Sequence, residues 1–217
     1  MRRPTVTLKL ATSLDGKIAL ANGQSEWITG DESRAAGRRL RATHDAIAVG
    51  SNTAVLDNPQ LTTRMDGAPN PIRIIFDSEL RLSPDSELAQ TANKTPVWVF
   101  CKSDQGQRAD ALKSLGVRLF PIAYKDKLDL EAALDFMFRN GVSTLLVEGG
   151  GTLAASFVKL GAIDRIEWFR APLILGGDGR SGIGELGLTD LSLARQYTRI
   201  EVNELGDDLH ERYERTV

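Results

Sequence analysis

Short apolar runs alternate with stretches of helical periodicity along most of this chain. Residues 142–160, VSTLLVEGGGTLAASFVKL, give the clearest example: a compact apolar run is followed by Glu148, three glycines, and apolar residues at helical spacing, Leu153, Phe157 and Leu160. A short apolar run of this kind is typical of a buried strand, and the spacing of three to four residues is typical of a helix. The segment therefore predicts a strand, a tight turn and a helix.

The three glycines of this turn, Gly149–Gly151, let the backbone adopt positive φ and let a ligand approach without a Cβ in the way. The helix that follows points its free N–H groups and its positive dipole end at the turn, which suits the phosphates of a nucleotide. Glu148 would lie at the carboxyl end of the strand, where open α/β sheets bind their ligands. The glycines can also be only a tight connection, since the pattern is neither G-x-G-x-x-G nor a Walker loop.

The same patterns, read along the whole chain, predict strands that alternate with helices and end in a hairpin. This order predicts the α/β class, with a mainly parallel sheet and an antiparallel edge. The predicted strands are Thr5–Thr12, Asp45–Gly50, Ile72–Phe76, Thr95–Phe100, Val117–Pro121, Leu145–Val147, a strand from Arg165 that ends near Pro172, and two strands within Gln196–Val217. The predicted helices are Asp31–Thr43 with Asp31 as its cap, Thr53–Leu56, Ala109–Leu115, Leu128–Arg139 and one from Thr152, and Leu61–Arg64 is predicted to be extended.

Composition places the chain among soluble globular proteins of one domain. It has 217 residues, a net charge of −2, 41% hydrophobic and 26% charged residues. This charge gives no support to a nucleic-acid partner, and no apolar run is long enough to span a bilayer. One cysteine and two histidines rule out an internal disulfide and an ordinary structural zinc site. We therefore expect a cytoplasmic protein without a membrane or metal partner.

Basic side chains in the N-terminal third are the candidates for binding an anion. Basic residues outnumber acidic ones in residues 1–73, and the reverse holds in the remainder. Arg34, Arg38 and Arg41 lie at i, i+4 and i+7, so they share one face of the predicted helix. One of them can hold a phosphate, although such a stripe can also be a solvated face. Lys9 is unusual within a first strand; its side chain points opposite to its apolar neighbours, and it can be solvated or functional.

Several fragments stand in one order that resembles the reductase domain of bifunctional riboflavin-biosynthesis deaminase–reductases. The resemblance covers essentially the whole chain and is most specific between residues 8 and 64. The fragments are LKLATSLDGKIA (8–19), SEWITG (25–30), LRATHDAIAVGSNTAVLDNPQLTTR (40–64), PIRIIFDS (71–78) and LLVEGGGTL (145–153). The zinc-binding His/Cys motif of the deaminase half has no match in this sequence. The expectation is a single reductase domain over residues 1–217 that stands alone.

This resemblance implies a fold like dihydrofolate reductase, with helices on both faces of a mainly parallel sheet and a C-terminal antiparallel hairpin. It also implies a reaction: NADPH-dependent reduction of the ribosylamino side chain of a pyrimidine 5′-phosphate to a ribitylamino side chain. The sugar reacts in its open form, and hydride from the nicotinamide attacks sugar C1. A homodimer is expected by the same similarity.

Site residues follow from the resemblance position by position. The pyrimidine-phosphate contacts of the family match Ser25, Arg41, Leu61, Arg64 and Glu148. Its NADPH contacts match Ala11, Trp27, Thr53, Asp57, Ser78, and the run Gly150, Gly151, Thr152, Leu153, Ala154, Ala155 and Ser156. Lys9 matches a lysine beside the reacting sugar. We expect Lys9 to relay the proton that hydride transfer demands, with Asp57 or Glu148 holding it.

Three other interpretations stay open at this point. The substrate can be the deaminated pyrimidine or the diamino pyrimidinone, which differ in one exocyclic group. The chain can be a divergent reductase of the same fold that acts on another substrate. It can also be a nucleotide-binding module without chemistry, although such a module needs no Lys9, Asp57 or Arg64. The loop from Gly176 to Gly187 is either a cofactor flap, which we favour, or a surface loop.

Overall fold

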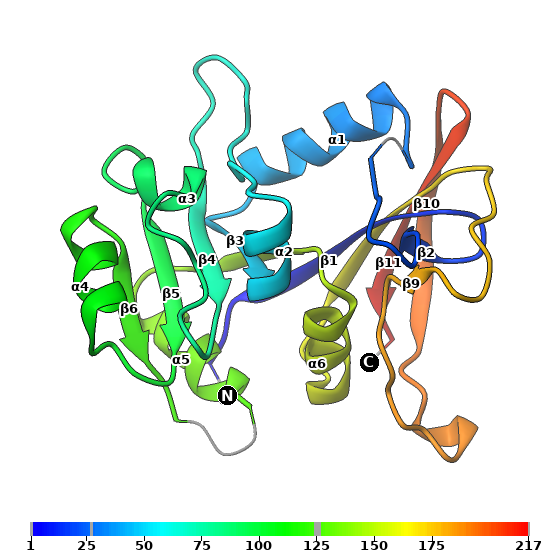
Figure 1. The fold of residues 1–217 in the computed structure, drawn as a ribbon. Helices are drawn as coiled ribbons and strands as arrows, with labels where there is room; N and C mark the ends of the chain where they lie inside the picture. Colours follow the sequence, from blue (N-terminus) through cyan, green and yellow to red (C-terminus); the bar gives the residue numbers. More distant parts are fainter. Residues whose placement is uncertain (1, 27, 124–126, 217) are drawn as a thin grey trace. The chain divides into compact units, whose positions relative to one another are not determined.

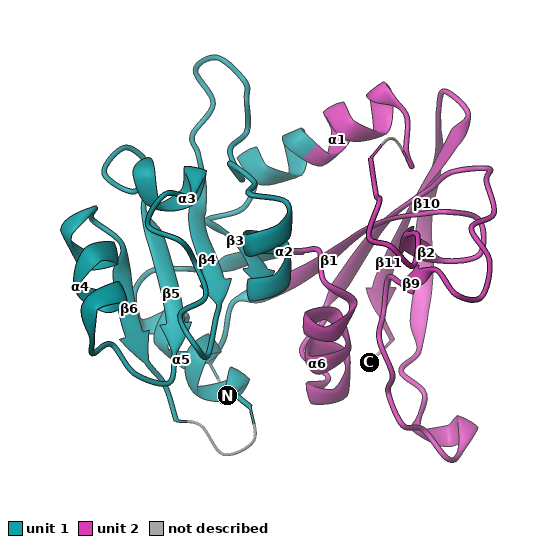
Figure 2. Cartoon of the chain, viewed as in Figure 1, with its two compact units in different colours: residues 1–5, 38–146 teal, residues 6–37, 147–217 magenta. Residues whose placement is uncertain are grey.

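A computed structural model describes residues 2–26, 28–123 and 127–216 (Figure 1). The chain divides into two compact units, unit 1 with residues 1–5 and 38–146 and unit 2 with residues 6–37 and 147–217 (Figure 2). Within the described residues, every helix is too short or too polar to cross a membrane.

Unit 1 is built on parallel strands that follow one another in sequence. Each strand of this unit pairs with the next one along the chain, in the order β3-β4-β5-β6. Such parallel neighbours need a crossover connection, and each connection between these strands contains one short helix. The strands are β3 (Ala46–Gly50), β4 (Ile72–Phe76), β5 (Val97–Cys101) and β6 (Arg118–Pro121), and the helices are α2 (Ser51–Leu56), α3 (Glu87–Gln90), α4 (Gln107–Ser114) and α5 (Leu130–Arg139).

Helices cover both faces of the sheet in unit 1. Because side chains alternate along a strand, Val97 and Val99 lie on one face of β5 and Trp98 and Phe100 on the other. The two valines belong to a buried cluster that includes apolar residues of α2, α3 and α4. On the opposite face, the ring of Phe136 in α5 packs 5.9 Å from Phe100 and 6.1 Å from Trp98, measured between ring centroids. Strand β5 is therefore buried on both faces.

Unit 2 combines a parallel strand pair with the C-terminal hairpin. Strand β1 (Thr5–Thr12), which belongs to unit 2 from Val6 on, pairs in parallel with β8 (Arg165–Arg170), and β8 pairs antiparallel with β11 (Asp208–Arg215). The hairpin partner of β11 is β10 (Tyr197–Leu205). The remaining elements that lie wholly in unit 2 are β2 (Lys17–Ala19), α6 (Gly151–Leu160), β9 (Arg180–Ser181) and the 3-10 helix η1 (Leu191–Leu193).

Two elements contribute residues to both units. Helix α1 (Asp31–Ala42) belongs to unit 2 up to Gly37 and to unit 1 from Arg38, and β7 (Thr144–Glu148) belongs to unit 1 up to Leu146. Both elements carry predicted site residues, Arg41 in α1 and Glu148 in β7.

The predicted fold class is confirmed, and the differences are local. The chain is α/β with a mainly parallel sheet and a C-terminal antiparallel hairpin. Asp31 was expected to cap its helix, but the helix begins at Asp31 itself. The helix expected from Leu128 begins at Leu130, because the Asp129 side chain accepts a hydrogen bond from the Ala132 N–H and caps it. Strand β8 ends two residues before Pro172, whose missing N–H cannot extend a ladder.

Candidate functional site

Lys9 is not the solvated strand lysine that its position also allowed. It is half-buried on β1, where its backbone partner on β8 is Glu167. The Lys9 Nζ lies 5.7 Å from the centroid of the Phe169 ring, over its face. The Lys9 Cε lies in van der Waals contact with the position that a Cβ would occupy at Gly37 of α1. The ammonium group therefore lies against the face of an aromatic ring.

Glu148 and the glycine turn form the second part of the site in unit 2. Glu148 is 8% exposed at the carboxyl end of β7. Gly149 and Gly150 then adopt φ of 81° and 82°, which side chains with a Cβ rarely tolerate. Gly150 precedes α6 and provides no side chain to cap its first N–H groups. The first turn of α6 therefore presents the backbone geometry that binds anions at helix N-termini.

The glycine-rich loop 176–187 packs against this helix start. The Gly184 N–H donates to the Gly151 carbonyl oxygen at 2.9 Å, and a Cβ on Gly151 would lie 2.3 Å from the Ser181 carbonyl oxygen. Strand β9, within the loop, pairs with β2. The loop is thus fastened to the helix start by close backbone contacts that only glycine permits at position 151.

Asp15 anchors the other end of the same loop. Its carboxylate accepts hydrogen bonds from the Ser13 hydroxyl at 2.6 Å, from the Leu175 N–H at 3.1 Å and from the Gly176 N–H at 2.8 Å. These bonds, the one from Ser13 most of all, lower the pKa of Asp15 from 3.8 to about 2. The turn at residues 13–16 therefore holds the glycine loop in place while Asp15 is ionised.

The remaining predicted residues of unit 2 lie along the same elements. Ala11 is half-buried on β1, two residues from Lys9 and so on the same face of the strand. Ser25 is exposed in the loop that follows β2. Thr152 to Ser156 lie in the first half of α6. Trp27 falls outside the residues that the structure describes.

In unit 1, Arg41 of α1 contacts the irregular segment that carries Leu61 and Arg64. The Arg41 guanidinium donates to the Thr62 carbonyl oxygen at 3.0 Å. Leu61 and Arg64 adopt φ of 54° and 50°. The expectation that residues 61–64 are extended is therefore wrong. A positive φ costs a side chain with a Cβ of order 1–3 kcal/mol, and such strain often marks functional segments.

Hydrogen bonds to neighbouring residues hold this strained segment. The Asn70 side-chain oxygen accepts from the Thr63 N–H at 2.9 Å and from the Thr63 hydroxyl at 3.1 Å. Arg73, fully buried on β4, donates to the Gln60 carbonyl oxygen at 3.3 Å. Burial lowers the pKa of Arg73 to about 10. The segment that carries Leu61 and Arg64 is thus fixed at both ends before any ligand binds.

Thr53 and Asp57 lie on the short helix that follows β3. The Asp57 N–H donates to the Thr53 carbonyl oxygen at 3.1 Å, and Asp57 closes α2 as its C-cap. The Asp57 side chain is exposed. Asp57 was expected at a strand end or in the loop beyond it. In the structure one short helix, α2, separates it from the end of β3.

Ser78 is one of the residues that line a cavity of about 480 Å³ in unit 1. Residues that follow β4 and β5 line it together with the start of α4. Two of its lining side chains are cationic: Lys102, whose Nζ lies 2.6 Å from a Glu79 carboxylate oxygen, and Arg108, which donates to the Leu80 carbonyl oxygen at 3.1 Å. The cavity lies at the carboxyl ends of parallel strands, where nucleotide ligands bind in such sheets.

Each unit therefore holds its own set of predicted residues. Lys9, Ala11, Ser25, Glu148 and the 150–156 turn belong to unit 2, and Arg41, Thr53, Asp57, Leu61, Arg64 and Ser78 belong to unit 1. Sequence reasoning missed Phe169, Lys102 and Arg108. The alternation in RIEWFR places Phe169 on the same face as Glu167, but only the pairing of β1 with β8 places it beside Lys9.

Comparison with known proteins identifies relatives over nearly the whole chain. Residues 4–210 match the family model described as RibD C-terminal domain. The chain is 34% identical over 210 residues to riboflavin biosynthesis protein RibD of Actinobacillus pleuropneumoniae, covering 96% of this chain but only 56% of that protein. It is 36% identical over 217 residues to a Methanothermobacter thermautotrophicus protein named 2,5-diamino-6-ribosylamino-4(3H)-pyrimidinone 5′-phosphate reductase, covering 95% of this chain and 96% of that protein.

Solved structures share the fold. Acinetobacter baumannii RibD superposes with a TM-score of 0.86 at 28% identity, covering 99% of this chain and 59% of that one. A pyrimidine reductase-like protein of Corynebacterium diphtheriae gives a TM-score of 0.84 at 19% identity, covering 99% of this chain and 92% of that one. The second likeness is one of fold alone.

The contact between the glycine loop and α6 yields a prediction. In Gly151→Ala the new Cβ meets the Ser181 carbonyl oxygen, so residues 181–184 must shift away from α6. We expect hydrogen exchange of the Gly184 amide to rise about tenfold or more, because its bond to position 151 opens. Gly177→Ala is the matched control, since a Cβ there meets nothing within 4 Å. Equal exchange in both variants would contradict the docked loop.

Proposed function

Because the chain belongs to the RibD C-terminal domain family, we propose that it reduces 5-amino-6-(5-phosphoribosylamino)uracil to the ribitylamino 5′-phosphate in riboflavin biosynthesis, with NADPH as reductant. The observation that carries the proposal is the position of Lys9, half-buried and held over the Phe169 ring. A binding module without chemistry has no need for a lysine in this position.

The described residues fit a dinucleotide phosphate. The uncapped start of α6, with Gly149 and Gly150 at positive φ, suits a pyrophosphate. The cavity beside Ser78 has the size for a nucleoside, and Lys102 and Arg108 suit the additional phosphate that distinguishes NADPH from NADH. When bound, this cofactor supplies a hydride. Thr53 and Asp57, close to the end of β3, are proposed to contact it as well.

Two arginine side chains suit the phosphorylated pyrimidine. Arg41 and Arg64 are proposed to bind its 5′-phosphate, since a guanidinium matches phosphate oxygens in a bidentate geometry. Arg41 is already oriented by its bond to the Thr62 carbonyl oxygen, and Arg64 is exposed on the strained segment. Leu61, Ser25 and Glu148 are proposed to contact the rest of the substrate.

Lys9 is proposed to supply the proton of the reaction. In the open form of the sugar, C1 is doubly bonded to the exocyclic nitrogen. Reduction adds a hydride to C1 and a proton to that nitrogen, so the double bond becomes a single bond and the product is an amine. The Lys9 ammonium is a suitable proton donor. Glu148 and Asp57 are proposed to orient the open sugar and to accept hydrogen bonds from its hydroxyl groups or from Lys9.

The diamino pyrimidinone is the second candidate substrate. The Methanothermobacter thermautotrophicus relative, whose length this chain matches, is named as the reductase of the ribosylamino form of that compound. The RibD relatives, of which the chain spans about half, are the reason to prefer the deaminated uracil. The two compounds differ in one ring substituent, so an assay decides between them.

Loss of absorbance at the NADPH band tests the proposal. The protein is mixed with NADPH and either the deaminated or the diamino 5′-phosphate. We expect turnover with the deaminated compound. We also expect a KM for NADH at least about tenfold above that for NADPH, because the loss of one phosphate contact costs about 1.4 kcal/mol or more of binding free energy. Turnover with the diamino compound alone would favour the second candidate, and NADPH binding without turnover of either would contradict both.

Lys9→Ala separates catalysis from cofactor binding. We expect kcat to fall by about a hundredfold or more, because general acid catalysis contributes roughly that factor, while the KM for NADPH changes less than about threefold. Lys17→Ala is the matched control, with wild-type kinetics expected, because Lys17 is also half-buried, on β2, and its Nζ bonds to the Ser181 hydroxyl. A raised KM with unchanged kcat would rule out the role as proton donor.

We also propose that the protein is a homodimer joined at the hairpin. Among the strands described for unit 2, β10 is an edge strand, and Ile200 and Val202 on it are 54% and 45% exposed. An exposed edge strand with apolar side chains is suited to pair with a second copy.

Light scattering tests this proposal. The wild type should have twice the mass of one chain, and Val202→Lys should have a lower mass; a wild-type monomer would contradict the proposal.

A further inference from the structure

Four charged residues of alternating sign form one row across the sheet of unit 2. Lys9 on β1 pairs with Glu167 on β8, Glu167 with Arg212 on β11, and Arg212 with Glu201 on β10. Directly paired residues on neighbouring strands project from the same face of a sheet. Lys9 therefore stands at one end of a charged row that continues to the edge strand.

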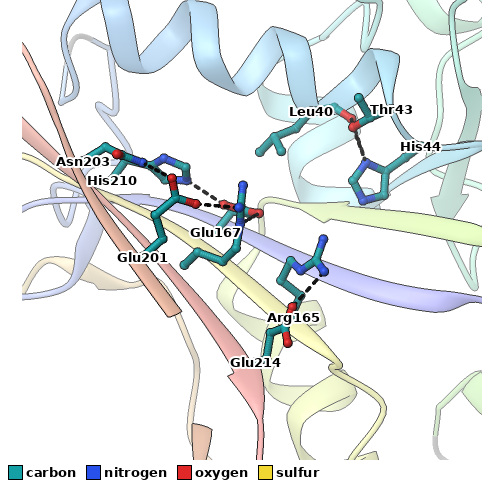
Figure 3. A network of polar contacts seen from close by, with 10 residues as sticks. Leu40, Thr43, His44, Arg165, Glu167, Glu201, Asn203, His210 and Glu214 are labelled. Atoms are coloured by element: carbon teal, nitrogen blue, oxygen red, sulfur yellow. Dashed lines mark hydrogen bonds and ion pairs between the residues drawn. The ribbon is translucent and has the colours of Figure 1, made fainter. Parts of the chain in front are cut away.

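The centre of this row is a buried carboxylate with two partners. Glu167 is 1% exposed; one of its oxygens lies 2.6 Å from His210 Nε2, and the other accepts from Arg212 Nε at 2.8 Å (Figure 3). Arg212 also donates to Glu201 at 2.6 Å. Burial alone would raise the pKa of Glu167, but the hydrogen bonds from His210 and Arg212 lower it. Glu167 is therefore an ionised anchor that fixes the His210 ring.

A second row lies beside the first and contains two stacked rings. Ala11, Phe169, His210 and Asn203 are paired in the same order across β1, β8, β11 and β10. The Phe169 and His210 rings lie 4.4 Å apart between centroids, with an angle of 5° between their planes. Because β8 lies between β1 and β11, Phe169 stands between the strand of Lys9 and the strand of His210. The chain of contacts runs from Glu167 to His210, then to Phe169, and then to Lys9.

We propose that Phe169 is a positioning residue for the reduction: its ring holds the Lys9 ammonium in place, and the His210–Glu167 pair holds the ring. The proposal rests on the proposed function through the role of Lys9. A cation is attracted to the face of an aromatic ring within about 6 Å of its centroid, and the Lys9 Nζ meets that distance. A lysine side chain has four rotatable bonds, so a fixed contact near its end restricts where it can deliver a proton.

Stacking on His210 explains how the ring itself is fixed. The His210 ring cannot turn freely, because its Nε2 is bonded to a buried carboxylate that also binds Arg212. A parallel neighbour at 4.4 Å in turn restricts rotation of the Phe169 side chain. The position of Lys9 therefore depends on residues of β8 and β11 that need not contact the substrate.

Kinetics of Phe169 variants test the proposal against a merely structural role. We expect Phe169→Leu to lower kcat by about tenfold and to change the KM for NADPH less than about twofold, whereas Phe169→Tyr, which keeps the ring, stays within about twofold of the wild type. Tyr213→Leu removes an aromatic ring from the opposite face of β11 and is the matched control, with wild-type kcat expected. Thermal unfolding of each variant checks that it is folded.

A double variant, Phe169→Leu combined with Lys9→Ala, completes this test. In the Lys9→Ala background, Phe169→Leu should lower kcat no further, because the ring has no ammonium to hold. An equal tenfold loss in both backgrounds would overturn the positioning role and leave the proposed function standing. Wild-type kcat for Lys9→Ala would instead refute the role of Lys9 in the proposed function.

A spectroscopic measurement tests the position of Lys9 without any activity. After 13C-dimethylation of the lysines, the Lys9 signal is assigned by its loss in Lys9→Arg. The ring current of Phe169 should shift this signal away from those of exposed lysines; Phe169→Leu should return it to them, and His210→Ala should move it in the same direction. A Lys9 signal that is unshifted in the wild type, or unchanged in both variants, would overturn the proposal.

Discussion

The parallel pairing of β1 with β8 is the constraint on which the rest of unit 2 depends. This register places Lys9 opposite Glu167 and Ala11 opposite Phe169, and the antiparallel pairing of β11 then adds Arg212 and His210 to the same face. A shift by one residue would turn every one of these side chains to the other face. The register is held by apolar residues on the opposite face, since Leu8 and Leu10, which flank Lys9 in the sequence, are buried. The register of β1 on β8 thus determines both the packing of the core and the surroundings of Lys9.

Turns with special backbone conformations supply the rest of the candidate site. In unit 2, Gly149 and Gly150 adopt positive φ directly before α6. The loop anchored by Asp15 packs against the start of this helix. In unit 1, Leu61 and Arg64 are held at positive φ by hydrogen bonds to Thr62, Thr63 and Gln60. In both units the backbone geometry is fixed by contacts within the same unit, which reduces the ordering that ligand binding must provide.

Strand and helix periodicity predicted most elements, because burial of one face or of a whole strand leaves a direct trace in the sequence. The turn at Gly149–Gly151 was predicted because a run of glycines indicates a backbone conformation that other residues rarely adopt. Leu61 and Arg64 were predicted as site residues, but their positive φ was not, because the segment is held by Arg41, Asn70 and Arg73, and no local sequence pattern indicates these contacts. The short strand β9 was missed because its pairing with β2 joins residues more than 160 positions apart. The surroundings of Lys9 depend likewise on β8 and β11, which no local pattern links to β1.

Transfer of deuterium is the most direct test of the central claim that this chain reduces sugar C1 with a hydride from NADPH. The protein would be incubated with NADPH in which both hydrogens at nicotinamide C4 are replaced by deuterium, together with the ribosylaminopyrimidine 5′-phosphate. The product would be examined by mass spectrometry and NMR. We predict a ribitylamino product that carries one deuterium, bonded to C1 of the side chain. A product without deuterium, or with deuterium at another carbon, would contradict the account.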